Sequence, residues 1–467
     1  MIDQSVLDRV LGEALRSGGS FAEVFAEDRT ISSALLDDGR VEQLSSGHDR
    51  GAGIRVVVGE TTGFAHTADL SEPGLMAAAR AAAAVARSAG GARTVTATPL
   101  GPPAGPVPGR RAGGAGAAGP ASKAQVLELL RRADDTARGA GGAISQVQAG
   151  YGGSRRQILV ANSDGVHHRD DQVRTRFSVS CVAVGDTGMQ TGFETAARTV
   201  GFELFDEVPV EELATEAAVR ALTKLAARPA PSGELPVVLA GGSGGILFHE
   251  ACGHGLEADH IAKEASVYAG KVGQLVASPL VTLVDDGSVG TEWGTAGIDD
   301  EGRPSQRNVL IDHGVLTEYM WDFLRARAEG RHSSGNGRRQ SYQHLPMVRM
   351  TNTFLLPGTD DPEEIVAQTP HGVYVAKLGG GQVNTTTGDF VFGTTEAYLI
   401  EGGKITEPLR DANLIGNGPE VLRRVDAVAD DFAMTPGTCG KDGQSVPVGC
   451  GQATLRITGV TIGGTAA

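Results

Sequence analysis

Two histidines and a glutamate lie close together in the segment GGILFHEACGHGLEADH, residues 244–260. Paired histidines with an adjacent glutamate are typical of zinc hydrolases, in which the imidazoles bind the metal and the glutamate moves a proton. His249 and His254 are five residues apart, however, whereas ligands on one helix face are normally four apart. At 3.6 residues per turn, this spacing separates the two side chains by about 140°. A regular helix through the segment therefore could not present both imidazoles to one ion.

The segment can still form a metal site if its helix is distorted. A wide π-type turn would bring His249 and His254 nearly into line, and such bulges occur mostly at functional sites. Gly253 and Gly255 flank His254 and lower the cost of distorting the backbone. We therefore expect an irregular helix between residues 249 and 255, with Glu250 as a candidate general base.

A catalytic zinc site usually needs a third protein ligand in addition to two histidines. The types of the remaining residues leave five candidates for that ligand, namely Glu257, Asp259, His260, Cys439 and Cys450. Composition alone does not decide among them. The simpler alternative is that both histidines only cap or pack a glycine-rich turn.

The elements that position these residues belong to regions of two kinds. Before about residue 230, helical segments enclose antiparallel strand pairs. Asp38-Gly39 and Asp164-Gly165 each mark a hairpin turn, and each is followed by a similar segment, GETTGF or GMQTGF. This recurrence predicts that one helix-plus-antiparallel-sheet unit is duplicated. Beyond that point, short strands between Gly, Asn and Asp turns predict a mostly β domain that carries the histidine helix.

We therefore expect an α+β fold with a helix-plus-antiparallel-sheet region followed by a mostly β C-terminal domain. An N-terminal α/β subdomain would occupy residues 1–98, and a second one would occupy residues 123–230. Residues 99–122 between them are nearly all Gly, Pro and Ala, a composition too poor in apolar side chains to offset the entropy of ordering. They are expected to form a flexible linker. The β-rich domain would span residues 231–467.

Composition and charge exclude several classes of function. The chain is 40% hydrophobic and 21% charged, as soluble globular proteins are. Its net charge of −15 argues against non-specific nucleic-acid binding, which needs a basic surface. We find no apolar run of about 18 residues that would cross a membrane, and the N-terminus is not of signal-peptide type. Because four cysteines do not make a disulfide framework in so long a chain, we expect a reduced, cytoplasmic protein.

Several long motifs resemble the TldD/PmbA proteins. They are FHEACGHGLEADH, GNGRRQSYQHLPMVRMTNTFLLPG, GGGQVN, FVFGTTEAYLIEGGKITEPLRDANLIGNG, CGKDGQSVPVGCGQATLRITGVTIGG and, near the N-terminus, LDDGRVEQLSSGHDRGAGIRVVVGETTGFAHT. The resemblance covers nearly the whole chain except residues 99–122. It implies a cytoplasmic zinc metallopeptidase that degrades unfolded or extended peptides, with an α/β N-terminal portion and a β-rich C-terminal domain.

By this resemblance, His249 and His254 would bind Zn²⁺, Cys439 would be the third ligand, and Glu250 would be the general base. The family commonly assembles as a heterodimer of a catalytic branch, which keeps H-E-x-x-x-H, and a paralogue that has lost it. This chain keeps the motif and so resembles the TldD, catalytic, branch. The expected partner is a PmbA- or TldE-like paralogue, or a second copy of the chain. Cys450 departs from the family pattern, where a small aliphatic residue is expected.

Other polar segments give less specific predictions. In GNGRRQSYQH, the side chains of Arg338, Arg339 and Tyr342 could line the cleft and contact substrate, or they could belong to a structural loop with charge pairs. The acidic segment GIDDEGRPSQR, residues 297–307, lacks the spacing of a calcium loop and is expected to be a solvated turn. The GGSGG loop before the histidine helix lacks the Lys-Ser/Thr of a nucleotide-binding loop.

The combined prediction is a zinc-dependent peptidase to which an extended peptide adds as a strand at an exposed sheet edge. One alternative is a non-proteolytic modulator or binding protein with a structural metal, which would show a fourth protein ligand such as Cys450 or Glu257. Another is a thiol redox protein that uses Cys439 and Cys450. It is disfavoured because their spacing is not C-x-x-C.

Overall fold

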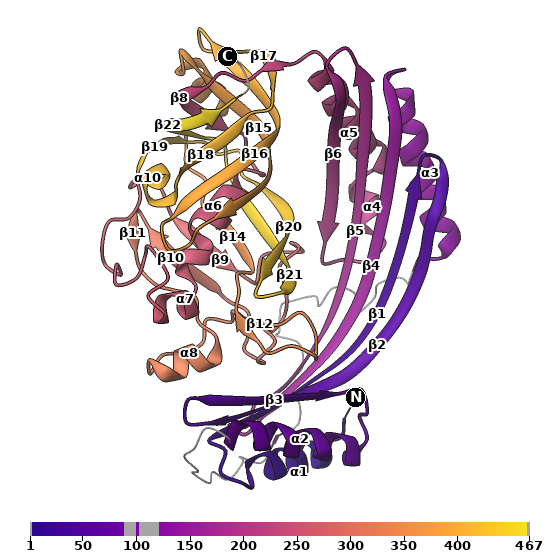
Figure 1. The fold of residues 1–467 in the computed structure, drawn as a ribbon, viewed down its shortest axis with the longest axis vertical. Coiled ribbons are helices and arrows are strands. Elements are labelled where there is room, and N and C mark those ends of the chain that lie inside the picture. The colour runs from indigo at the N-terminus through magenta and orange to yellow at the C-terminus, as the bar shows by residue number, and fades with distance from the viewer. Residues whose placement is uncertain (1, 88–99, 102–120, 465–467) are drawn as a thin grey trace.

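The computed structural model describes residues 2–87, 100–101 and 121–464, which form two regions of different architecture (Figure 1). The N-terminal region is built on one antiparallel sheet with the strand order β3-β2-β1-β4-β5-β6. Its strands are β1 (Phe21–Asp37), β2 (Arg40–Val58), β3 (Thr61–Thr67), β4 (Ile144–Asn162), β5 (His167–Gly185) and β6 (Gly188–Arg198). The predicted α+β class is confirmed.

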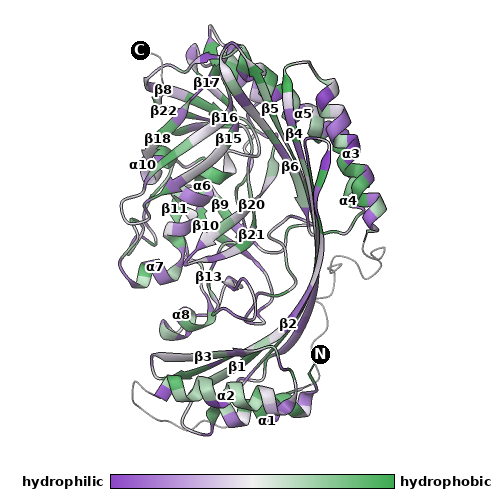
Figure 2. Ribbon diagram, turned by 45° about the vertical axis from the view of Figure 1, so that its right-hand side comes forward, coloured by the Kyte–Doolittle hydropathy of each residue, from purple (hydrophilic) through white to green (hydrophobic). Residues whose placement is uncertain are grey.

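Amphipathic helices cover the two ends of this long sheet. At one end lie α1 (Gln4–Leu15) and α2 (Glu72–Arg87), whose apolar faces pack on β1, β2 and β3. At the other end lie α3 (Lys123–Gly139) and α5 (Val210–Leu225), with the short α4 (Leu204–Glu207) beside them. Figure 2 shows that these helices carry both hydrophobic and hydrophilic segments, as expected for helices with one buried face.

The N-terminal sheet has an internal symmetry that explains the repeated sequence. β1 and β4 pair at its centre, β2 and β5 flank them, and β3 and β6 come last on either side. A Cβ atom added at Gly63 of β3 would lie 2.0 Å from the carbonyl oxygen of Ala82 in α2, and one added at Gly192 of β6 would lie 1.9 Å from that of Ala217 in α5. The glycines of TTGF and QTGF thus let a helix backbone touch the sheet in both halves, which supports the predicted duplication.

The two N-terminal parts therefore share a sheet. Their predicted division into residues 1–98 and 123–230 stays a prediction, as does the third part, residues 231–467. The predicted linker lies outside the described residues except at both of its ends. At its start Leu100 is buried, and its N–H donates a hydrogen bond of 3.1 Å to the Asp8 carboxylate.

The C-terminal region is mostly β, as predicted. One sheet has the order β15-β8-β22-β18-β16-β17-β7, with β19 also paired to β22, and it closes on itself because β15 pairs with β16. A second sheet has the order β11-β10-β9-β14-β21-β20, and β12 pairs with β13. The strands are β7 (Arg228–Pro229), β8 (Gly233–Leu239), β9 (Leu283–Asp286), β10 (Arg307–Asp312), β11 (Val315–Leu316), β12 (Gly337–Arg338), β13 (Met347–Val348), β14 (Asn352–Leu355), β15 (His371–Val383), β16 (Asp389–Glu401), β17 (Lys404–Arg410), β18 (Asn413–Asn417), β19 (Val425–Val428), β20 (Ala433–Lys441), β21 (Gln444–Gln452) and β22 (Leu455–Gly463).

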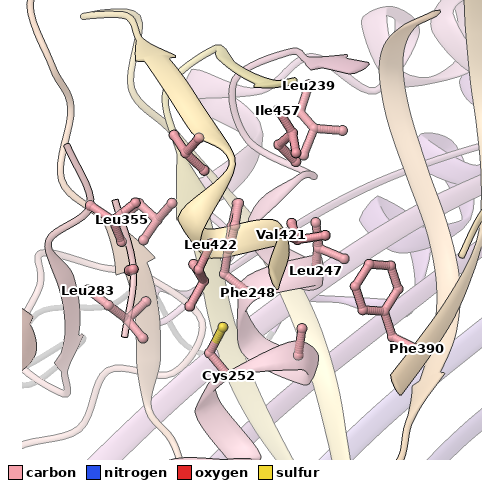
Figure 3. Close-up of a cluster of buried hydrophobic side chains, with 14 of the residues drawn as sticks. Leu239, Leu247, Phe248, Cys252, Leu283, Leu355, Phe390, Val421, Leu422 and Ile457 are labelled. Atoms are coloured by element: carbon pink, nitrogen blue, oxygen red, sulfur yellow. The ribbon is translucent and has the colours of Figure 1, made fainter. Parts of the chain in front are cut away.

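Short helices connect these strands, and one of them lies in the core. They are α6 (Gly245–Ala251), a 3-10 helix (Gly253–Leu256), α7 (Ala258–Ala262), α8 (Phe323–Ala328), α9 (Pro362–Ala367) and α10 (Gly418–Arg423). Leu247, Phe248 and Cys252 from the α6 segment pack against Leu283 and Leu422 in the main apolar cluster (Figure 3). Among the described residues, no helix has the length and apolarity needed to cross a bilayer.

The acidic segment GIDDEGR is buried between the two regions, so the prediction of a solvated turn is wrong. Asp299, Asp300 and Glu301 are each at most 4% exposed. Glu301 pairs with Arg55 of β2, and Asp300 pairs with Arg156 of β4, both at 2.8 Å. Buried carboxylates are retained where such partners exist, and these partners come from strands far away in the sequence.

We predict that Gly192→Ala destabilises the protein by about 1–3 kcal/mol, because the new methyl group must push α5 off the sheet. Gly152→Ala in β4 is the matched control, since a Cβ there meets no atom within 4 Å. Chemical denaturation followed by circular dichroism would measure both. Equal unfolding midpoints for the two variants would contradict the close helix–sheet contact.

Candidate metal centre

The α-helix of the histidine segment stops between its two histidines. α6 ends at Ala251, Cys252 adopts φ −126° and ψ −53°, and the 3-10 helix begins at Gly253. The expected irregularity between residues 249 and 255 is therefore present, but it is a break followed by a 3-10 turn and not a π-type turn. This change of path brings the rings of His249 and His254 within 5.2 Å of each other, centroid to centroid, at an interplanar angle of 84°.

Glycines determine where this segment lies by allowing close packing. A Cβ atom added at Gly245 would lie 2.3 Å from the backbone nitrogen of Gly451 in β21. One added at Gly253 would lie 2.1 Å from the sulfur of Met350. Because these positions lack side chains, the backbone of α6 lies directly against β21. Gly253 was expected to lower the cost of distorting the backbone. Gly245 and Gly253 also allow close contacts with neighbouring segments.

The hairpin of β20 and β21 brings a thiol to the histidines. Asp442 and Gly443 form its two-residue turn with φ values of +48° and +76°, as in a type I′ turn. Side chains alternate along β20, so the buried Cys439 and Lys441 face the segment of residues 249–259 while the exposed Thr438 faces the other way. β20 is also the last strand of its sheet.

His249, His254 and Cys439 form one buried cluster. Their candidate ligand atoms all lie within 4.8 Å of one another, and Cys439 Sγ is 3.3 Å from His254 Nε2. Within the described part of the chain, neither ring nitrogen of His249 has a hydrogen-bond partner, although the residue is only 2% exposed. Leaving buried polar atoms unsatisfied is costly, and a metal ion would satisfy one of the two nitrogens. Two imidazoles and a thiolate are ligands that Zn²⁺ accepts, so these residues fit the ion.

The electrostatics of the cluster favour a thiolate at Cys439. Burial opposes ionisation of the thiol, but the adjacent imidazoles of His249 and His254 outweigh it and lower the pKa of Cys439 to about 4. Burial likewise acts against a charged His254, yet Glu257 and Cys439 raise the pKa of that imidazole to about 10. Since the thiolate is the form that binds metals, the metal-free cluster already holds the required ligand.

A buried chain of charges orients His254. Its Nδ1 lies 3.0 Å from a carboxylate oxygen of the fully buried Glu257, which leaves Nε2 directed at Cys439. The ammonium of Lys441 lies 2.9 Å from Glu257 and 2.8 Å from Asp259. Burial opposes ionisation of Glu257, but His254 and Lys441 lower its pKa to about 2. Such outer partners fix the tautomer and direction of a metal-binding imidazole.

Three of the five candidates for the third ligand thus belong to this supporting group. Glu257, Asp259 and His260 form a second set of closely spaced side chains. The ammonium group of Lys441 donates hydrogen bonds to Glu257 and Asp259 of this set. Cys439 is the candidate that meets both histidines. Lys441 was not predicted, although its position two residues after Cys439 in CGK places it on the same face of the strand.

Glu250 lies beside the cluster on its more open side. Its side chain is 25% exposed, and one carboxylate oxygen is 3.7 Å from His254 Nε2. A carboxylate that reaches both solvent and a cluster of metal-binding residues can exchange a proton with a water molecule located there.

Models of known families match this chain along most of its length. The PmbA/TldA metallopeptidase domain 1 matches residues 22–86, the central domain matches 118–225, and the C-terminal domain matches 232–464. A protein named metalloprotease TldD homolog from Haemophilus influenzae is 40% identical over 454 residues, which is 95% of this chain and 93% of that protein. The chain belongs to the PmbA/TldD metallopeptidase family.

Other members of the PmbA/TldD family and related solved structures agree with this assignment. A metalloprotease from Methanothermobacter thermautotrophicus is 33% identical over 464 residues, covering 99% of this chain and all of that protein. The crystal structure of TldE from Thermococcus kodakarensis superposes with a TM-score of 0.76 at 20% identity, over 98% of this chain and 99% of that one. A Thermotoga maritima protein described as a candidate modulator of a DNA gyrase gives 0.79 at 19%, over 98% and 100%. Both structures share the fold.

Cys450, the departure from the family pattern, lies in β21 near the same histidines. It is buried and outside the cluster in which all ligand atoms are within 4.8 Å. Although burial acts the other way, Cys450 and Cys439 together raise the pKa of His249 well above its ordinary value. Cys439 thus belongs to the cluster and Cys450 lies outside it, so substitution of the two thiols should affect Zn²⁺ affinity differently.

The three residues predicted to contact substrate, Arg338, Arg339 and Tyr342, lie in two different environments. Arg338 and Arg339 line a pocket of about 410 Å³ between the N-terminal sheet and the β20–β21 hairpin. Tyr342 instead packs with Phe25 and other apolar residues of the sheet, and its N–H donates to Glu27 at 2.8 Å. A role in substrate binding stays a prediction for all three.

We predict that Cys439→Ala lowers the affinity for Zn²⁺ by more than the roughly 10–100-fold that loss of an outer partner costs, because a ligand itself is removed. Cys450→Ala, which removes a buried thiol from the adjacent strand, should bind Zn²⁺ as the unmodified protein does. Competition with a chromophoric chelator would measure both affinities. Equal losses in the two variants would indicate a four-ligand site.

We also predict that Glu257→Gln weakens Zn²⁺ binding by about 10–100-fold, because the amide no longer stabilises the orientation and charge of His254. Asp259→Asn is the control, since Asp259 bonds Lys441 and, within the described part of the chain, makes no hydrogen bond to His254. The same chelator competition, with thermal unfolding to verify folding, would test this. An equal effect of the two changes would contradict a specific role for Glu257.

Proposed function

We propose that this chain is a zinc-dependent peptidase that hydrolyses peptide bonds in unfolded or extended peptides. The observation that carries the proposal is the buried cluster of His249, His254 and Cys439 with the partly exposed Glu250 beside it. Three protein ligands leave one position of a tetrahedral ion for water or substrate, as catalytic sites require. Relatives named metalloproteases along nearly the full length of the chain support the same function.

The chain's own residues have distinct parts in this reaction. When bound, Zn²⁺ would supply a Lewis acid that polarises the scissile carbonyl and lowers the pKa of a water molecule. His249, His254 and Cys439 would hold it. Glu250 would accept the proton of the attacking water and later deliver it to the leaving amine, which its exposure and its 3.7 Å distance from His254 allow. Glu257 would keep His254 in the orientation that binding requires.

The substrate would bind by adding a strand to β20. This strand carries Cys439 and ends its sheet, so its outer backbone groups lie free of strand partners within the sheet pairing of the described residues. Strand addition recognises backbone hydrogen bonds more than side chains. It would therefore accept many sequences, and it would select unfolded chains because a folded protein cannot present an unpaired strand.

A PmbA- or TldE-like paralogue, or a second copy of the chain, is the proposed partner. The shared fold with TldE from Thermococcus kodakarensis supports this choice. A surface for a partner is available at residues 40–50 of β2, which are exposed throughout because β3 pairs with β2 only from Ala52 onward. An unpaired edge of this length is a suitable surface for another chain.

We further propose that the protein works in the reducing environment of the cytoplasm. All four cysteines are free and buried. Cys439 must remain a reduced thiolate to bind metal, and cytoplasmic thiols are kept reduced.

A second candidate function is a non-proteolytic modulator or binding protein with a structural metal. One observation favours it, namely the influence of Cys450 on His249, which places a second thiol near the cluster. With four protein ligands the site would be closed, and Glu250 would have no catalytic part. Zinc binding by the Cys450→Ala variant and peptide cleavage distinguish this candidate from the peptidase.

We predict that Glu250→Gln keeps bound Zn²⁺ but lowers peptide cleavage by about 100-fold or more, the range that loss of a general acid–base group produces. Glu264→Gln, at an exposed site outside the cluster, should cleave as the unmodified protein does. Zinc content and cleavage of a fluorescence-quenched unfolded peptide, with and without the paralogue, would be measured. Full activity of the Glu250 variant would refute the mechanism.

A further inference from the structure

The 410 Å³ pocket between the two regions is rich in arginine. Strands β1, β4 and β5 contribute Arg29, Arg156 and Arg174, while Arg338 and Arg339 come from the opposite wall. The acidic residues that line the same pocket are Asp299 and Asp300. In a chain whose net charge is −15, this concentration of guanidinium groups stands out as a local feature.

Part of this positive charge is neutralised within the protein. Arg156 pairs with Glu27 at 2.7 Å and with Asp300 at 2.8 Å. Arg339 pairs with Glu23 and stacks on the ring of Phe25, with its guanidinium carbon 4.3 Å from the ring centroid. These two arginines form part of the junction between the regions.

The carboxylate of Asp299 is bound by backbone N–H groups of the protein itself. It accepts the backbone N–H groups of Glu301, Arg303 and Gly337. Burial, together with repulsion from Glu301, raises its pKa well above the ordinary value, while these three N–H groups act in the opposite direction.

Among the described residues, the acceptors that Arg174 and Arg338 bond are all neutral. Arg174 donates to the side-chain oxygen of Gln172 at 2.7 Å and to the carbonyl oxygens of Trp293 and Thr295 at 3.3 Å and 3.0 Å. Arg338 donates to the carbonyl oxygens of Pro447, at 2.7 Å, and Met350. Each arginine is only 7% exposed. Two buried guanidinium groups without a carboxylate partner are costly unless a ligand supplies the negative charge.

Two further observations agree with a missing anion. Burial, with Arg338 and Arg156 nearby, lowers the pKa of Arg174 to about 9, and burial lowers that of Arg338 to about 10. Within the described part of the chain, Nε and Nη1 of the 1% exposed Arg339 have no hydrogen-bond partner. The pocket therefore holds donors that the protein itself does not use.

Of the β20–β21 hairpin residues that line the pocket, Val446 packs with Cys439, while the others lie on the face opposite to the metal centre. These others are Thr438, Ser445 and Pro447, whereas Cys439 faces the histidines. A peptide strand added to β20 would have the same alternation, so neighbouring residues would face the metal centre and the pocket in turn. A group one strand position away from the cleaved bond would thus face these arginines.

We propose that this pocket is a carboxylate-binding subsite, in which Arg174 and Arg338 hold the carboxylate of a bound peptide next to the residue at the metal centre. The carboxylate comes either from an acidic side chain or from the free C-terminus of the peptide. The planar, doubly donating guanidinium group suits it in both cases. This inference rests on the proposed peptidase function, because a peptide strand on β20 delivers the carboxylate.

Binding to the cleavage-deficient Glu250→Gln protein tests the subsite apart from catalysis. Four labelled peptides of equal length would be compared by fluorescence anisotropy: one with an internal glutamate and an amidated C-terminus, one with glutamine there and a free C-terminus, one with both carboxylates, and one with neither. We expect at least tenfold tighter binding of a peptide with the effective carboxylate than of the neutral peptide. The first two peptides identify its source. Equal affinity for all four, or binding of none, would overturn the inference.

Substitution of the arginines locates the effect. In the Glu250→Gln background, Arg174→Met and, separately, Arg338→Met should abolish the preference for the carboxylate, measured as the ratio of the affinities for the carboxylate peptide and the neutral peptide. Arg132→Met, which removes an exposed arginine of α3 paired with Glu211, should retain the preference. Retention in both pocket variants would overturn the assignment.

Kinetics of the otherwise unmodified enzyme separate this inference from the proposed function. The Arg174→Met and Arg338→Met changes should raise the ratio of KM for the carboxylate peptide to KM for the neutral peptide at least tenfold, a difference that a general folding defect would not produce. Cleavage without any carboxylate preference would overturn the subsite alone. Selective binding without cleavage would support the subsite and refute the peptidase.

Discussion

The contact between α6 and β21 decides whether this fold can contain a metal centre. His254 and Cys439 are 185 residues apart in the chain, and they meet because a helix backbone touches a strand backbone at Gly245 and Gly451. A side chain at Gly245 would move the helix outward and separate His249 from the thiol. On its other side α6 is held by the apolar cluster of Leu247 and Phe248 (Figure 3). Packing between α6 and β21 therefore determines where the two histidines and the thiol lie, and the types of these residues determine that they can bind a metal.

Buried ion pairs favour one arrangement of these packed segments. Glu257 and Lys441 connect the histidine segment to β20, and Glu23 connects Arg55 in the N-terminal sheet to Arg339 in the C-terminal region. Buried ion pairs often contribute little net stability, but removing one partner leaves an uncompensated charge that costs several kcal/mol, roughly 3–5. An altered arrangement of the hairpin, or of the two regions, would leave such charges unpaired. These pairs therefore favour one arrangement over its alternatives.

Features that depend on residues close together in the sequence could be predicted from it. The Asp38-Gly39 turn, the irregular helix between residues 249 and 255 and the α+β class follow from backbone preferences and hydrophobic patterns, and the structure contains all three. Long-range pairing could not be predicted in this way. Residue types left five candidates for the third ligand, and only the resemblance to a family pointed to Cys439. The acids at 299–301 looked solvated because the arginines that neutralise them lie in strands more than a hundred residues away.

The two-residue turn at Asp442-Gly443 limits how this protein can change during evolution. Because side chains alternate along a strand, adding or deleting one residue between the turn and Cys439 would exchange the faces of Cys439 and Thr438. The same shift would move Lys441 away from Glu257 and place it toward the arginine pocket. Length changes are usually tolerated at hairpin tips, yet here the deletion of one residue would remove the thiol from the histidines and place the hydroxyl of Thr438 there instead. This surface loop is therefore expected to vary in sequence much more readily than in length.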